Sequence, residues 1–136
     1  MATVVCISCV KSKRDHRSRA EDLYTSPLFR MLLAYAKFLD PHRILVLSAK
    51  HGVLELDDEV DPYEMTLNRM GKADRLAWAD RVLGQLRQRV DLDRDEFVFL
   101  AGQRYREFLI PHIRHASVPM EGLALGKQLA WLKRRL

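Results

Sequence analysis

The chain has 136 residues, of which 48% are hydrophobic and 30% charged, and its formal net charge is +5. This length fits a single domain, residues 1–136, with a core of its own. No apolar run approaches the roughly 20 residues of a membrane helix, and the N-terminus lacks the basic region of a signal peptide, so we expect a cytoplasmic protein without a membrane partner. The positive charge favours nucleic acid or a nucleotide as partner, although a basic surface that binds nothing explains it equally well.

The first element in the chain is a short strand over 3–7, where β-branched residues dominate. Ser8, Cys9, Lys11 and Lys13 follow it in a loop without glycine, which suits binding of an anion or a carbonyl group through side chains. Ordinary surface lysines are the alternative interpretation. Cys6 and Cys9 have the spacing of half a metal or redox site, but no second pair completes it. We therefore expect Cys6 in the core, Cys9 in a loop near the site, and neither a metal nor a cofactor.

A helix follows, because Ser26 fits the N-cap position and Pro27 the first helical position. Apolar residues then recur at helical spacing up to Leu39. The polar stretch 14–21 before this helix is expected to be an exposed loop or a frayed turn. The helix leads into a second strand, so the first 50 residues predict a βαβ unit with a right-handed crossover.

The second strand covers Ile44 to Leu47, a continuous apolar run typical of a strand buried on both faces of a parallel sheet. Ser48, Lys50, His51 and Gly52 follow it directly. Open α/β sheets bind ligands outside the carboxyl ends of their strands. This stretch is therefore the centre of the predicted site.

The second half of the chain repeats the pattern. A long helix is predicted over 72–90, a third strand over 96–100 and a final helix over 128–136. Gln103, Arg104 and Tyr105 follow the third strand. A fourth strand near Pro119 and Gly122 would be short or at an edge. The fold class is α/β: a three-layer sandwich whose mostly parallel central sheet of about four strands is flanked by helices.

Two further segments can reach this site. Tyr63 and Glu64 lie in a loop after a proline, and they either cover the site or pack and face solvent. Glu121 and Lys127 lie in the apolar tail before the last helix. A glycine at position 126 can leave helix amides free for an anion.

The residues that follow the three strands divide by chemistry. His51, whose ordinary pKa is near neutrality, is the candidate general acid or base, with Glu64 or Glu121 as carboxylate partner and Lys50 as a rival nucleophile. The expected substrate-binding residues are Ser8, Cys9, Lys11, Lys13, Ser48, Gly52, Tyr63, Gln103, Arg104, Tyr105, Glu121 and Lys127. Cations hold phosphate, while amides, hydroxyls and aromatic rings read or stack on a base.

The segments SC-x-KSK, LYTSPLFR, SAKHGVL, PYE-x-TL, GQRYREFL and EGLALGKQLAWL together resemble a bacterial and phage family of uncharacterised proteins. The first four are distantly similar to the core of YaaA-type peroxide-stress proteins and of the archaeosine synthase domain. Ser8, Cys9 and Lys11 match the first motif of that synthase only in part. The resemblance implies an α/β fold that acts on nucleobases, in DNA repair, base modification or phage-related defence.

The residues and the resemblance favour an enzyme that acts on a nucleobase in nucleic acid or a nucleotide, by hydrolysis or exchange of the N-glycosidic bond. A non-catalytic nucleic-acid-binding module and a nucleotide sensor are the alternatives.

Overall fold

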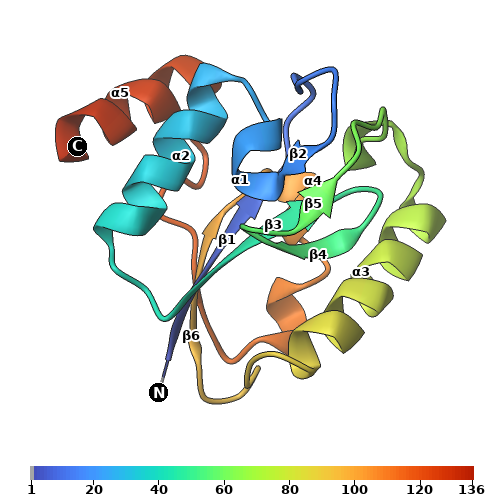
Figure 1. The fold of residues 1–136 in the computed structure, drawn as a ribbon. Helices are drawn as coiled ribbons and strands as arrows, with labels where there is room; N and C mark the ends of the chain where they lie inside the picture. The colour runs from blue at the N-terminus through green and yellow to red at the C-terminus, as the bar shows by residue number, and fades with distance from the viewer. Residues whose placement is uncertain (1) are drawn as a thin grey trace.

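The computed structural model describes residues 2–136, which fold around one mixed five-stranded sheet in the order β4-β3-β1-β6-β7 (Figure 1). Its strands are β1 (Thr3–Ser8), β3 (Arg43–Ser48), β4 (Gly52–Glu55), β6 (Glu96–Leu100) and β7 (His115–Ser117). All neighbouring pairs are parallel except β3 and β4, which form an antiparallel hairpin. The α/β fold with a mostly parallel central sheet is confirmed, with five strands instead of about four.

The helices and short turns connect these strands. They are α1 (Ala20–Leu23), α2 (Pro27–Phe38), η1 (Leu67–Arg69), α3 (Lys72–Arg87), α4 (Gln103–Arg106), η2 (Ile110–His112) and α5 (Leu125–Arg135). Helices α2 and α5 lie against each other on one side of the sheet, and α3 lies on the other side (Figure 1). Within residues 2–136, no helix is both long and apolar enough to cross a membrane.

The core lies on both faces of the central strands. Val4, Val5, Cys6 and Ile7 are fully buried, although successive side chains of a strand point to opposite faces. Both faces must therefore be covered, which explains why the apolar runs in β1 and β3 are continuous and do not alternate. Cys6 lies in this core as expected, and both cysteines are free.

Strand β1 is the point where the direction of the chain across the sheet reverses. The first crossover, through α2, places β3 on one side of β1, and the second, through α3, places β6 on the other. The carboxyl end of β1 is thus a topological switch point, where open α/β sheets form a crevice.

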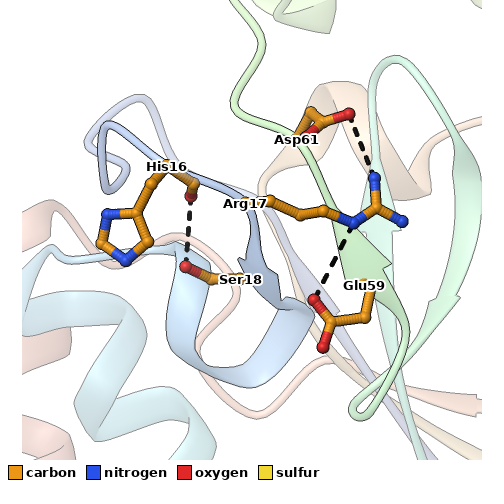
Figure 2. Close-up of polar contacts among 5 residues, drawn as sticks. All are labelled: His16, Arg17, Ser18, Glu59 and Asp61. Carbon is orange, nitrogen blue, oxygen red and sulfur yellow. Dashed lines mark hydrogen bonds and ion pairs between the residues drawn. The ribbon is translucent and has the colours of Figure 1, made fainter.

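A second, two-stranded sheet joins the loop after β1 to the segment after β4. It pairs β2 (Ser18–Arg19) with β5 (Glu59–Val60). Figure 2 shows Arg17 between two carboxylates of the opposite segment, with Nη1 3.1 Å from Asp61 Oδ2 and Nε 3.9 Å from Glu59 Oε2. In the same figure the Ser18 hydroxyl donates to the carbonyl of His16. These contacts hold residues 10–19 beside residues 56–66, and both segments reach the strand-end region.

Several element boundaries differ from the prediction. The helix cap at Ser26 is confirmed, since its hydroxyl accepts from the Phe29 amide. The expected exposed loop or frayed turn over 14–21 is right only in part: residues 14–17 and Arg19 are exposed, whereas Ser18 and Ala20 are buried and the segment contains β2 and the start of α1. Strand β4 was not predicted, and helix α5 begins at Leu125, three residues before the predicted start at Gln128.

Candidate functional site

A large cleft opens at the carboxyl ends of β1 and β6. Its volume is about 1230 Å³, which is ample for a small-molecule ligand. We call it the strand-end cleft. It is bounded by the loop after β1 (8–13), the start of α2, the segment 64–70, the loop after β6 and the chain from Val118 to Gln128. The Gly102 amide donates to Ser8 Oγ at 3.2 Å, which ties the ends of β1 and β6 together.

Many of the residues that line the strand-end cleft are apolar. They are Leu28 and Leu32 of α2, Phe99 and Leu100 of β6, Met65, Met70, Val118, Met120, Leu123 and Leu125. Two of them, Met65 and Leu125, are exposed. Such side chains suit a flat, weakly polar ligand group.

The lining also contains polar side chains, and four of its five charged residues are basic. Lys11, Lys13, Arg69 and Arg106 supply four positive charges, and Glu64 supplies one negative charge. Ser8, Cys9, Thr66, Asn68, Gln103, Tyr105 and Gln128 add hydrogen-bonding groups. The cleft lining therefore combines apolar side chains with polar ones of net positive charge.

A smaller pocket of about 450 Å³ shares residues with the cleft. Lys11, Lys13 and Glu64 line both, and Arg14, Asp15, Pro62 and Tyr63 complete the smaller one. Lys13 and Glu64 thus stand at the boundary between the two spaces.

Buried hydroxyl groups support this boundary from below. The Tyr63 hydroxyl lies 2.6 Å from the Tyr24 hydroxyl and accepts from Ser48 Oγ at 2.7 Å. The Ser48 hydroxyl in turn accepts from the His51 amide, and the Ser48 backbone carbonyl accepts from the Trp78 indole. Burial is the main reason why the pKa of Tyr63 and the pKa of Tyr24 lie above their usual values. These groups stay protonated and position the loop.

Seven of the residues expected from the sequence line the strand-end cleft: Ser8, Cys9, Lys11, Lys13, Glu64, Gln103 and Tyr105. Tyr63 lines the adjoining pocket, and Ser48 is fully buried behind it. The loops after β1 and β3 lie at the same edge of the sheet, as expected, because Ser8 pairs with Leu47 in the register.

The SAKHG residues take a different place from the expected one. Because the chain reverses after Ser48 into β4, Lys50 is exposed and outside both pockets, and its carbonyl accepts from Arg81. The His51 ring packs edge-on against the Tyr63 ring at 5.4 Å between centroids and lines neither pocket. Burial, together with the charges of Lys50 and Arg81, lowers the pKa of His51.

Gly52 has a structural reason to be glycine. Its φ is +74°, and a Cβ there would meet the side chain of Gln85. Its position at the start of β4 therefore depends on the lack of a side chain.

Three more expected residues lie outside both pockets within the part of the chain that the structure describes. Arg104 and Lys127 are exposed, and exposed Glu121 lies 3.8 Å from Arg106 Nη2. Two cleft cations were missed. Arg106 follows the third strand by six positions, so the strand-end argument could have included it, whereas no pattern marked Arg69.

The chain belongs to DUF6884, a family of unknown function, whose model matches residues 4–134. Uncharacterized protein YfjM from Bacillus subtilis (strain 168) is similar to it, with 36% identity over 122 residues, which cover 85% of this chain and 79% of that relative. No solved structure matches the chain. The expected relation to a family of uncharacterised proteins is confirmed.

Proposed function

We propose that the protein binds a nucleotide, or one nucleotide unit of a nucleic acid, in the strand-end cleft and acts on the N-glycosidic bond of its base. The observation that carries this proposal is that the lining of the cleft combines apolar side chains with basic and hydrogen-bonding ones. A nucleotide combines matching chemistries, with a flat base and an anionic phosphate.

The lining residues fit separate parts of such a ligand. Lys11, Arg69 and Arg106 provide charge for phosphate, and the Gln103 amide can donate to and accept from the edge of a base. The distant similarity to YaaA-type proteins and to the archaeosine synthase core points to the same class of ligand.

Glu64 is the carboxylate of this proposal. It is exposed at the junction of the two pockets, where it can activate water or stabilise an oxocarbenium ion. His51 supports the site through its contact with the Tyr63 ring and does not transfer the proton.

A thermal-shift screen tests binding first. The ligands are nucleobases, nucleosides, nucleotides and short single- and double-stranded oligonucleotides at low salt. We expect one nucleotide-containing class to raise the melting temperature, Lys11→Ala and Gln103→Ala to reduce the shift, and Lys133→Ala, an exposed lysine near the end of α5, to leave it unchanged. If no ligand shifts the melting temperature, the proposal is wrong.

Chromatographic detection of the released base then tests the reaction. Glu64→Gln keeps the size of the side chain and should retain binding while it slows base release at least 100-fold. Base release at the wild-type rate in this variant would remove Glu64 from the mechanism.

A binding module without catalysis is the second candidate. The placement of His51 outside both pockets favours it, because the most versatile proton-transfer residue of the motif does not face the ligand. If the protein is such a binding module, we expect oligonucleotide binding that weakens as salt is added, and no base release by the wild-type protein.

A further inference from the structure

Lys13 has an environment that sets it apart from the other lysine of the same loop. Its ammonium nitrogen lies 4.5 Å from the centre of the Tyr63 ring and 5.7 Å from that of the Tyr24 ring, and it donates to the Lys11 carbonyl at 3.2 Å. The residue is half-buried, whereas Lys11 is exposed. Aromatic rings and backbone therefore fix the amine at the junction of the two pockets.

The amine of Lys13 has no ion-pair partner among residues 2–136. Burial lowers the pKa of Lys13, and the nearby Cys9 and Glu64 act in the opposite direction. Other titratable or charged groups beside it are Tyr24, Tyr63, Lys11, Arg14 and Asp15. A neutral lysine amine is a nucleophile, and desolvation is the usual way in which a protein produces one near neutral pH.

We propose that Lys13 is an imine-forming nucleophile of the strand-end cleft and that its substrate is a base-free pentose in nucleic acid, whose open form carries an aldehyde at C1′. The inference rests on the proposed function, because release of a base from a nucleotide unit in the cleft would generate this aldehyde there. The basic residues that line the cleft fit the phosphates on either side of such a sugar.

The reaction balances without a redox partner. The nitrogen lone pair of the neutral amine adds to C1′, and the two amine hydrogens leave with the carbonyl oxygen as water. A C1′=Nζ double bond replaces the C1′=O bond. Glu64, at the same junction, is placed to carry protons between nitrogen and oxygen.

Cys9 is a further nucleophilic group at the cleft, and the geometry favours it less than Lys13. Its side chain is buried, with 7% of the residue exposed, and its thiol donates to the Tyr105 hydroxyl. Lys13 lines both pockets and is the more accessible nucleophile.

Reductive trapping tests the inference. The protein is mixed with an oligonucleotide that contains one abasic site, and cyanoborohydride reduces any imine to a stable amine. We expect a covalent adduct that mass spectrometry maps to Lys13. Lys13→Arg, which keeps the positive charge, should reduce the adduct at least tenfold, and Lys133→Arg, at an exposed lysine that lines neither pocket, is the matched control that should not. An adduct at another residue, or an unchanged yield in Lys13→Arg, would overturn the inference.

A phosphate-bearing aldehyde, pyridoxal 5′-phosphate, separates this inference from the proposed function, because the reagent is used only as a probe of the amine. We expect preferential labelling of Lys13 over Lys11 and Lys50. One outcome is that Lys13 is labelled and trapped on abasic DNA, while no ligand raises the melting temperature and no base is released. The proposed function then fails, and the inference about the Lys13 amine stands. If base release occurs and Lys13 is neither labelled nor trapped, the amine fails and the proposed function stands. Labelling without trapping would overturn the substrate assignment.

The pH profile of labelling distinguishes a nucleophile from a structural lysine. Glu64→Gln removes a group that raises the pKa of Lys13, so the labelling rate of this variant should rise at a lower pH than that of the wild type. An unchanged or oppositely shifted profile would contradict the inference.

Discussion

The Cys9 thiol, at the end of β1, donates a hydrogen bond of 3.3 Å to the hydroxyl of Tyr105, which lies 96 positions further along the chain in α4. The same hydroxyl accepts from the Leu67 amide at 3.3 Å and lies 3.4 Å from Thr66 Oγ1. One phenol therefore connects three walls of the strand-end cleft.

Tyr105→Phe should loosen these walls. The change leaves the buried Leu67 amide without this acceptor, and we expect the free energy of unfolding to fall by about 1–3 kcal/mol. Urea denaturation measures this loss, and hydrogen exchange should show faster opening at residues 66–68. Tyr35→Phe is the control, because the Tyr35 hydroxyl makes no side-chain hydrogen bond among residues 2–136. An equal loss in both variants would assign the effect to removal of a hydroxyl in general and not to the hydrogen bonds of Tyr105.

Gly52→Ala should destabilise the β3–β4 hairpin. A side chain at φ +74° costs about 1–3 kcal/mol, and the added methyl group also meets Gln85. Gln85→Ala is destabilising by itself because the Gln85 amide bonds to the Val53 amide and the His51 carbonyl. The double variant relieves the collision, so its loss in stability should be smaller than the sum of the two single losses. Additive losses in chemical denaturation would argue against the collision.

Two ion pairs differ in exposure, so breaking them should reduce the free energy of unfolding by different amounts. Arg75 Nε lies 3.1 Å from Glu107, and its Nη1 donates to the Met70 carbonyl, with only 11% of the Arg75 side chain exposed. Glu107→Gln leaves this charge uncompensated and should cost about 2–4 kcal/mol. Glu55→Gln breaks the more exposed pair with Arg43 and should cost less than about 1 kcal/mol. Thermal or urea unfolding compares the two variants directly, and equal costs would contradict the argument from burial.

Stability should fall in alkaline solution. Burial raises the pKa of Cys6 from 9.0 to about 12, so the unfolded thiol ionises before the folded one. A pKa raised by folding gives stability that is complete below the unfolded pKa and is lost as the pH rises toward the folded pKa. The raised pKa values of Tyr24, Tyr63 and Tyr105 act in the same direction from about pH 10 upward.

The measurement is the free energy of unfolding between pH 8 and pH 11. In the wild type, the free energy of unfolding should fall as the pH rises. Between about pH 9.5 and 11, Cys6→Ala should make this fall less steep by about 1.4 kcal/mol per pH unit. Near pH 8 the thiol is protonated in both states, so the variant should show only a constant offset there. A wild-type curve that stays flat up to pH 11 would contradict the buried thiol.

The sequence predicted best where a periodic pattern and its boundary agree. The strands β1, β3 and β6 and the cap at Ser26 were found within one residue, because apolar runs end there in polar residues. Strand β4 was missed because Val53 and Leu54 form too short a run to distinguish a strand from a loop. The chain reverses into this antiparallel strand through Gly52, whose φ is positive. The sequence alone does not predict which backbone conformation a glycine adopts.

The same hairpin explains why Lys50 and His51 lie outside both pockets. Lys50 and His51 follow a strand as directly as Cys9 does, but the chain after Ser48 turns back beside β3, whereas the chain after β1 continues over the cleft. Local order in the sequence does not reveal this difference. Arg69 reaches the cleft only through tertiary packing of η1, for which no periodicity exists.

Gln85 and Asp58 protect an exposed sheet edge against pairing with another copy of the protein. Strand β4 is an edge strand, and the outward amides of an edge strand are a template on which another chain can add. The Val53 amide donates to Gln85 Oε1 and the Glu55 amide to Asp58 Oδ2, both at 2.8 Å. Side chains thus take the place of the missing neighbour strand. In a concentrated solution, β4 therefore offers fewer free backbone amides on which a second molecule could form an intermolecular sheet.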